Sequence, residues 1–233
     1  MNKFFNLMAL LIATISFASA QTILKEGMIR YEITDVESSD PSTDAQLSMM
    51  KGSDMTVYFS ADKQRVDMDM MGGMMKMTTL YSAKDSNAIM LMEMMGKKMK
   101  MTMDPEKIKQ MQGQQSEKMK EKPKVEHFKD ETKEILGYKC HKVVITMQTD
   151  AGDMSMTLYV SDQIKMFRSV AQGTEELDLG GSALEYTVNV KNMMKMTYTA
   201  TKVETELKEG ALEVDMEGYE EVDPKMLGGM FGN

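Results

Sequence analysis

Methionine recurs at every second residue along much of the stretch from Val66 to Met103. A period of two is typical of a β-strand with one buried face, whereas an amphipathic helix repeats its apolar residues every three or four positions. The methionines that follow this period are Met68, Met70, Met75, Met77, Met90, Met92, Met94, Met99, Met101 and Met103. The stretch is therefore predicted to form four antiparallel strands that share one methionine-rich face.

Two glycine-containing turns support this prediction. A hairpin that turns at Gly72-Gly73 pairs Met70 with Met75, Met68 with Met77 and, on the opposite face, Asp69 with Lys76. A hairpin that turns at Gly96-Lys97 pairs Met94 with Met99, Met92 with Met101, Met90 with Met103 and, on the opposite face, Glu93 with Lys100. Both registers gather apolar side chains on one face, and a slip by one residue would expose every methionine to water.

Two further hairpins are predicted downstream. Residues 138–149 and 154–160 are expected to pair Met147 with Met156, Ile145 with Leu158 and Val143 with Val160. Residues 183–190 and 194–203 are expected to pair Val190 with Met194, Val188 with Met196 and Tyr186 with Tyr198. Residues 130–137 and 163–181 lack a clear period, and we interpret them as a polar turn region and an irregular segment.

The remaining signals complete the predicted fold. A helix is expected after Asp104-Pro105, because aspartate favours the N-cap and proline the first helical position. A second, short helix is expected within residues 38–52. The sequence thus predicts a mainly β protein, with a single curved antiparallel sheet that forms a half-open barrel and one or two inserted helices. A β-sandwich is the alternative.

The chain begins with the features of a secretory signal peptide. Lys3 precedes an apolar run over residues 4–17, and Ala18-Ser19-Ala20 matches a small-residue cleavage site. Residues 1–20 are therefore predicted to be removed, with a retained N-terminal anchor as the alternative. We expect residues 21–224 to form one domain, residues 225–233 to form a flexible tail, and the protein to be exported, either periplasmic or secreted.

Charge and cysteine content limit which partners the protein can bind and how its fold is stabilised. Without residues 1–20, the chain carries 27 Lys and Arg against 36 Asp and Glu residues, a net charge of −9. This acidic balance argues against binding to nucleic acid and to anionic membrane surfaces. Cys140 is the sole cysteine, so the domain has no internal disulfide and depends on its core for stability. An envelope protein is one candidate partner. The composition of the chain does not indicate an oligomeric state.

The segment from Thr132 to Lys142 has the form T-x-x-I-x-G-Y-x-C-x-K. It resembles the domain-of-unknown-function 4412 family of exported proteins, and the stretches after Glu26 and Glu217 are also similar to that family. The resemblance covers roughly residues 27–223. The family is similar in turn to periplasmic lipoprotein carriers of the LolA/LolB type, which implies a half-open antiparallel barrel that carries acyl chains on its concave face. No binding residue is implied by a matching motif.

The methionine face has two interpretations that its period does not distinguish. It is either plain core, because methionine is a flexible apolar filler, or core together with an adaptable cavity for a lipid or acyl chain. The second interpretation predicts a non-catalytic protein that binds an apolar small molecule or lipid. The predicted ligand contacts are Met68, Met70, Met75, Met77, Met90, Met92, Met94, Met99, Met101, Met103, Met156, Leu158 and Met196.

Two other functions remain open. Thioether sulfur is a soft ligand suited to Cu(I) or Ag(I), so the same face is compatible with a soft-metal binding protein. Histidine and thiolate ligands, which often support such sites, are limited to His127, His141 and Cys140. The third candidate is a structural envelope protein without a ligand.

Catalysis is not predicted. Cys140 has no general base at a recognisable spacing, and its simplest interpretation is a small buried apolar residue. The carboxylates Asp67, Asp69 and Glu93 fall on the polar face, where they fit solvated surface pairs better than acid–base chemistry. No cofactor is expected.

Overall fold

The structure is a computed structural model that describes residues 23–223, apart from residues 86, 107–120, 150–151, 172, 176 and 192. In this part of the chain, twelve strands form one sheet, and α1, Pro41–Ser48, is the one helix that is described over its whole length. The strands are β1 Gly27–Ser38, β2 Asp54–Phe59, β3 Lys63–Met70, β4 Met75–Ser82, β5 Ala88–Met94, β6 Lys97–Met103, β7 Lys124–Ile135, β8 Tyr138–Thr149, β9 Gly152–Ser161, β10 Ser182–Val190, β11 Met194–Glu204 and β12 Glu220–Glu221. The predicted mainly β class and the single curved sheet are confirmed.

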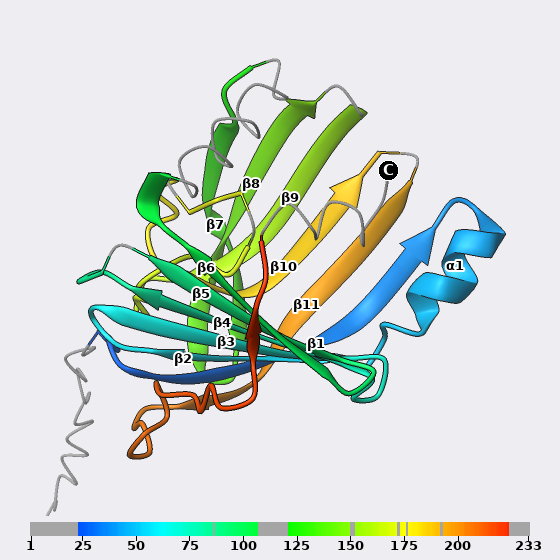
Figure 1. The fold of residues 1–233 in the computed structure, drawn as a ribbon. Coiled ribbons are helices and arrows are strands. Elements are labelled where there is room, and N and C mark those ends of the chain that lie inside the picture. The colour runs from blue at the N-terminus through cyan, green and yellow to red at the C-terminus, as the bar shows by residue number, and fades with distance from the viewer. Residues whose placement is uncertain are drawn as a thin grey trace, which may run out of the picture.

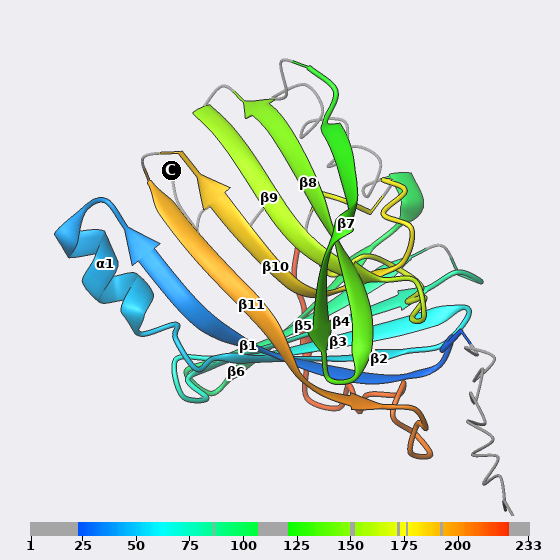
Figure 2. The same ribbon diagram turned by 180° about the vertical axis from the view of Figure 1, so that it is seen from behind.

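The sheet consists of two meanders joined edge to edge. Its strand order is β12-β6-β5-β4-β3-β2-β1-β11-β10-β9-β8-β7, so β1 to β6 form one half and β7 to β11 the other. Every neighbouring pair is antiparallel except β12 with β6. Strong curvature sets the two halves at an angle to each other, like an open shell (Figures 1 and 2).

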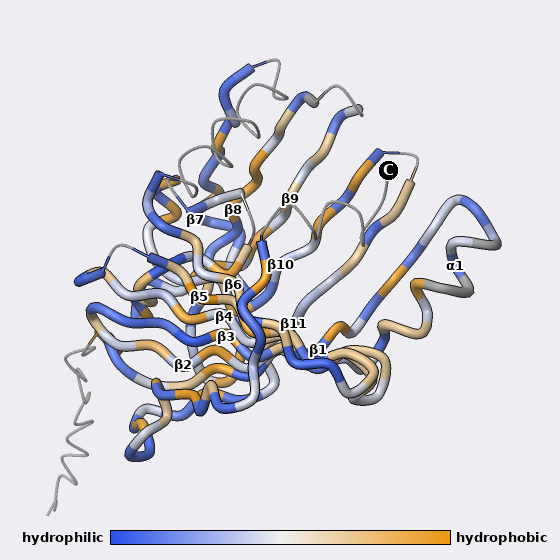
Figure 3. Tube along the Cα trace, viewed as in Figure 1, coloured by the Kyte–Doolittle hydropathy of each residue, from blue (hydrophilic) through white to orange (hydrophobic). Residues whose placement is uncertain are grey.

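The core lies on the inner side of this curved sheet. Residues of β1 and β2, including Tyr31 and Phe59, share one hydrophobic cluster with residues of β8 to β10, including Leu158. The segment between β9 and β10, residues 162–181, adds Ile164, Met166, Ala171 and Leu179 to the same cluster. Apolar and polar positions alternate along the strands of both halves (Figure 3), as expected for a sheet with one buried face.

One glycine allows this segment to return to the sheet. A Cβ atom at Gly181 would lie 2.1 Å from the carbonyl oxygen of Ser161, at the end of β9. No side chain fits at that separation, so glycine is required where the segment passes β9 and enters β10.

Two predicted registers are confirmed. In the β3–β4 hairpin the pairs are Met70 with Met75, Met68 with Met77 and Asp69 with Lys76. In the β10–β11 hairpin they are Val190 with Met194, Val188 with Met196 and Tyr186 with Tyr198.

The predicted register between β5 and β6 is wrong by two residues. The observed pairs are Met92 with Met99, Met90 with Met101, Met94 with Lys97 and Glu93 with Lys98. They replace the predicted pairs Met94 with Met99, Met92 with Met101, Met90 with Met103 and Glu93 with Lys100. The turn is Met95-Gly96, whose φ angles of 52° and 78° are both positive, as a two-residue turn of type I′ requires. A displacement by two residues keeps each methionine on its predicted face.

The register between β8 and β9 is also displaced by two residues. Met147 pairs with Met154, Ile145 with Met156 and Val143 with Leu158, in place of the predicted partners Met156, Leu158 and Val160. The two strands stay paired as far as Thr149 and Gly152, closer to the connection than the sequence indicated. The apolar period cannot distinguish these registers, because both bury the same side chains.

Strand β7 contains most of a segment that the sequence predicts to be a turn. It runs from Lys124 to Ile135, with a register irregularity between Phe128 and Thr132, and the turn is confined to Leu136-Gly137. This strand lies at an edge of the sheet and is exposed over most of its length. A strand exposed on both faces has no need of an apolar period, which is why its sequence resembles a loop.

The short helix expected within residues 38–52 is confirmed as α1. The helix expected after Asp104 begins at Pro105 and Glu106, which are helical, and its continuation into residues 107–120 lies outside the described residues. The signal peptide at residues 1–20 and the tail at residues 225–233 also lie outside them, so the limits of the domain remain a prediction. Within the described ranges, no helix is long and apolar enough to cross a membrane.

Candidate ligand-binding face and the adjoining pocket

A single row of methionines crosses one half of the sheet at right angles to its strands. Its members are directly paired from strand to strand, in the order Met55, Met68, Met77, Met92 and Met99. Directly paired residues have their side chains on the same face of a sheet. We call these five residues the methionine row.

The methionine row faces the inner side of the sheet. Met55 belongs to the hydrophobic core, and Met68 packs against it. Met92 is buried at 3% exposure, whereas Met68, Met77 and Met99 are half-buried. The row therefore begins within the core at β2 and remains partly open towards β6.

The other predicted contacts lie on either side of this row or in the second half of the sheet. Towards the hairpin tips, Met70, Met75 and Met94 form a shorter, half-buried row. On the side of the row away from the hairpin tips, Met90 pairs with Met101, and Met103 pairs with Ala88. Met101 and Met103 are buried, and Met90 is half-buried. The structure therefore places all ten methionines predicted in β3 to β6 on one face.

Three predicted contacts are separate from this group. Met156 and Leu158 on β9 are buried within the hydrophobic core. Met196 on β11 is buried at 5% exposure and pairs with Val188. These residues lie in the second half of the sheet and do not extend the methionine row.

The opposite face of β2 to β6 carries the charged residues of these strands together with the fully buried Leu91, and it is partly covered by the chain after β11. Arg65 forms an ion pair of 2.7 Å with Asp67, and it also donates hydrogen bonds to the backbone oxygens of Ala211 and Glu213. Glu93 accepts a hydrogen bond of 2.5 Å from the hydroxyl of Tyr219. Burial and this hydrogen bond raise the pKa of Tyr219 to about 12. These carboxylates therefore have structural partners on the polar face, as their sequence pattern predicts.

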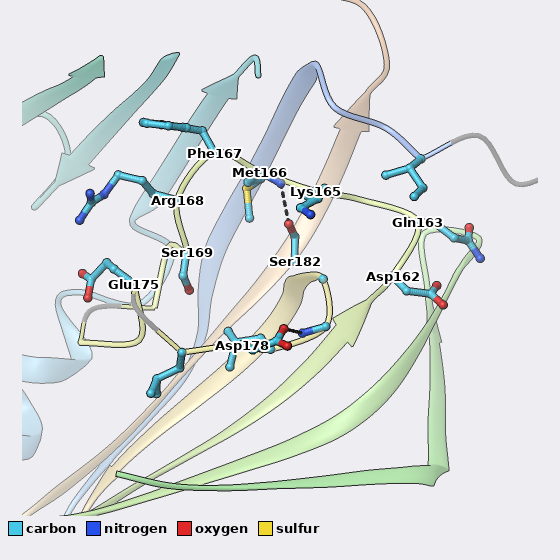
Figure 4. A pocket seen from close by; sticks show the side chains of 15 residues that line it. Asp162, Gln163, Lys165, Met166, Phe167, Arg168, Ser169, Glu175, Asp178 and Ser182 are labelled. Atoms are coloured by element: carbon cyan, nitrogen blue, oxygen red, sulfur yellow. Dashed lines mark hydrogen bonds between the residues drawn. The ribbon is translucent and has the colours of Figure 1, made fainter. Parts of the chain in front are cut away.

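A pocket of about 620 Å³ lies beside the inner face, within residues 162–182 (Figure 4). Its lining combines apolar side chains such as Phe167 and Leu177 with the cations Lys165 and Arg168. The acids Asp162, Glu175 and Asp178 also line it. None of the predicted ligand contacts does, and none lines a second pocket of about 340 Å³ between the α1–β2 and β3–β4 connections.

Arg168 connects this pocket to the inner face of the sheet. Its guanidinium carbon lies 4.7 Å from the centroid of the Tyr81 ring, on β4, and its backbone N–H donates a hydrogen bond of 2.8 Å to the side chain of Gln64, on β3. Burial raises the pKa of Tyr81, and the positive charge of Arg168 partly opposes that rise. The sequence offered no periodic signal for this pocket, since residues 163–181 appear there only as an irregular segment.

Cys140, His127 and His141 lie on the paired strands β7 and β8. Cys140 is fully buried, and burial raises the pKa of its thiol to about 12, so the thiol remains protonated at neutral pH. The rings of His127 and His141 stack with centroids 5.8 Å apart. Burial and the neighbouring His127 lower the pKa of His141. Among the described residues, no three His, Cys, Asp or Glu side chains are grouped so as to hold a metal ion.

Fold and face together define an antiparallel β protein with one curved sheet, an apolar inner side and an irregular segment packed into it. The model of the DUF4412 family, a domain of unknown function, matches residues 42–217. The chain belongs to this family, as the motif in β7 and β8 indicates. No curated protein sequence matches the chain significantly.

PNGF-II and the lipoprotein LppX are among the solved structures that are similar to the chain. PNGF-II is 15% identical with a TM-score of 0.51, over 88% of this chain and 33% of PNGF-II. The chain thus spans about a third of the length of PNGF-II, and this similarity concerns the fold alone. The lipoprotein LppX of Mycobacterium tuberculosis is 9% identical with a TM-score of 0.38, over 79% of this chain and 89% of LppX.

Proposed function

We propose that the protein is an exported, non-catalytic binding protein that holds a lipid or acyl chain against the methionine row. The observation that supports this proposal is the continuity of that row across five strands, with Met68, Met77 and Met99 only half-buried. Methionine side chains are flexible and polarizable, so such a strip adapts to apolar ligands of different shapes at low cost. Export follows if residues 1–20 act as a signal peptide.

Native mass spectrometry of the purified protein tests this function directly. A bound acyl mass that organic extraction removes is the expected result. In parallel, the delipidated protein is titrated with a fluorescent long-chain alkyl probe. If the protein carries no bound acyl mass and does not bind the probe, the proposal is overturned and a structural protein without a ligand is favoured.

A matched pair of variants locates the binding face. Met77→Gln keeps the length of a half-buried side chain of the row but adds an amide, which we expect to weaken probe binding about tenfold through the cost of burying an unpaired polar group. Met74→Gln makes the same change three residues away, at a position 67% exposed in the hairpin tip. Equal affinity of both variants for the probe would argue against the methionine row as the binding surface.

A second candidate function rests on a different property of the same row. The direct pairs Met68 with Met77 and Met92 with Met99 place thioethers side by side, with Cα atoms of paired residues about 4.5–5.5 Å apart in such sheets. Soft thioether ligands at this spacing suit Cu(I) or Ag(I). Retention of Ag(I) against a competing thioether chelator would favour this candidate, and loss of all the metal to the chelator would remove it.

A further inference from the structure

The position of Arg168 is fixed from two directions. Its backbone N–H is bonded to Gln64, which is 1% exposed, and its guanidinium lies over the ring of Tyr81. The first contact holds the main chain against β3, and the second holds the side chain over β4. The charge of Arg168 is therefore held at one place on the inner side of the sheet.

Arg168 also differs from the other arginines of the chain. Arg30 forms an ion pair of 2.7 Å with Asp54, and Arg65 one of 2.7 Å with Asp67. Within the described ranges, no carboxylate forms an ion pair with Arg168. Glu175 is on the same side of the pocket (Figure 4), but no hydrogen bond or ion pair joins the two side chains. Because arginine stays charged at every physiological pH, a half-buried cation without a carboxylate is available to an anionic ligand.

The distance from Arg168 to the methionines fits a long acyl chain. Tyr81, Thr79, Met77 and Met75 follow one another at every second residue of β4 and share its inner face. Strands rise about 3.3 Å per residue, so Tyr81 and Met75, which lie six positions apart, are separated by about 20 Å, the length of a long extended acyl chain. A chain laid along β4 would cross the methionine row at Met77 with its head at Arg168.

We propose that the ligand is a singly charged anionic amphiphile, whose carboxylate or phosphodiester head is bound by Arg168 and whose chain lies on the methionines. This inference rests on the proposed function. Tyr81 covers one flat side of the Arg168 guanidinium. The N–H groups at the edge of the guanidinium can form the paired hydrogen bonds that carboxylates and phosphates accept. The acids Asp162, Glu175 and Asp178 line the same pocket and oppose a head with several negative charges.

Matched ligands test the inference on the unaltered protein. The delipidated protein is titrated with hexadecanoate, hexadecanol and a lysophosphatidylglycerol, each by displacement of the same fluorescent alkyl probe. We expect at least one of the anionic ligands to bind about tenfold more tightly than the alcohol. A preference for hexadecanoate alone identifies a carboxylate head, and a preference for the lysolipid alone identifies a phosphodiester head.

Variants assign this preference to one side chain. Arg168→Gln should remove the preference while leaving hexadecanol affinity unchanged. Arg65→Gln, which removes a similarly stacked arginine from the opposite face, should leave the preference intact. Equal affinity of the wild-type protein for the acid, the lysolipid and the alcohol would overturn the role of Arg168 but leave the proposed function standing. Failure of all three ligands to bind would overturn the proposed function itself.

Discussion

The hydroxyl of Tyr31 donates a hydrogen bond of 2.7 Å to the backbone oxygen of Ala183, a residue 152 positions later in the chain. Tyr31 belongs to β1 and Ala183 to β10, and both residues are buried. Burial raises the pKa of Tyr31 far above its usual value, so the hydroxyl remains a donor at any physiological pH. Because β1 and β10 are the two neighbours of β11, the bond passes over β11 and joins the two halves of the sheet.

Tyr31→Phe should lower the free energy of unfolding by about 1–2 kcal/mol, because the carbonyl of Ala183 then remains buried without its donor. Urea denaturation measures the change. Tyr58→Phe is a suitable control, since the Tyr58 ring lies under Arg65 on the polar face. An equal decrease in the free energy of unfolding of both variants would show that the bond between Tyr31 and Ala183 does not stabilise the fold specifically.

Burial of the methionine row predicts a large contrast between two neighbouring methionines. Met92 is 3% exposed and Met95 is 92% exposed, three residues apart in the same hairpin. Met92→Asp buries a charge without a partner and should destabilise the fold by more than about 3 kcal/mol, whereas Met95→Asp should change stability by less than about 0.5 kcal/mol. Thermal unfolding separates the two. Near-wild-type melting of Met92→Asp would contradict the burial of this row.

A turn residue offers a stabilising change. Leu136 has a φ of 52° in the β7–β8 turn, a left-handed conformation that a branched apolar residue adopts at a cost and asparagine adopts more readily. Leu136→Asn should therefore raise the free energy of unfolding by about 0.5–1 kcal/mol. Met74→Asn provides a comparison at an exposed turn position outside the positive-φ residues. A gain of the same size at Met74 would indicate that replacing an exposed apolar side chain by an amide stabilises the protein, and that relief of backbone strain does not.

The buried thiol of Cys140 predicts a dependence of stability on alkaline pH. Its pKa is raised from 9.0 to about 12, chiefly by burial. Below pH 9 the thiol is protonated in both states, so its contribution is constant. Between pH 9 and pH 12 the unfolded state loses this proton first, and stability falls by up to about 1.4 kcal/mol per pH unit. Urea denaturation between pH 8 and pH 10.5 should give a smaller decline for Cys140→Ala, and equal slopes would contradict the raised pKa.

The sequence predicts the faces of the strands better than their partners. The methionines of β3 to β6 lie on one face because alternation alone determines which side of a strand a residue occupies. The pairing of Met92 depends instead on the turn, and the observed two-residue turn at Met95-Gly96 lies one position earlier than the turn expected at Gly96-Lys97. Methionine occupies every second position on both strands. A displacement by two residues therefore still pairs methionine with methionine, and the sequence pattern cannot distinguish the two registers.

The candidate binding site could be predicted only in part. The methionine row follows from periodicity, whereas the position of Arg168 depends on contacts with Gln64 and Tyr81, about a hundred residues earlier in the chain. Such contacts depend on how residues 162–181 pack into the curved sheet. An irregular segment has no period from which its packing can be inferred.

The two borders of the sheet differ in a way that limits self-association. Strand β12 pairs with Met99 and Lys100 of β6, and Val222 donates a further backbone hydrogen bond to Lys100, so another copy approaching this border must first displace the molecule's own chain. At the far border, β7 is open but carries a dense series of charged side chains. If two molecules joined through β7, each would still present β6 at its other border, where β12 and Val222 already bind the backbone of Met99 and Lys100. Growth beyond a pair through that border would therefore require the release of β12.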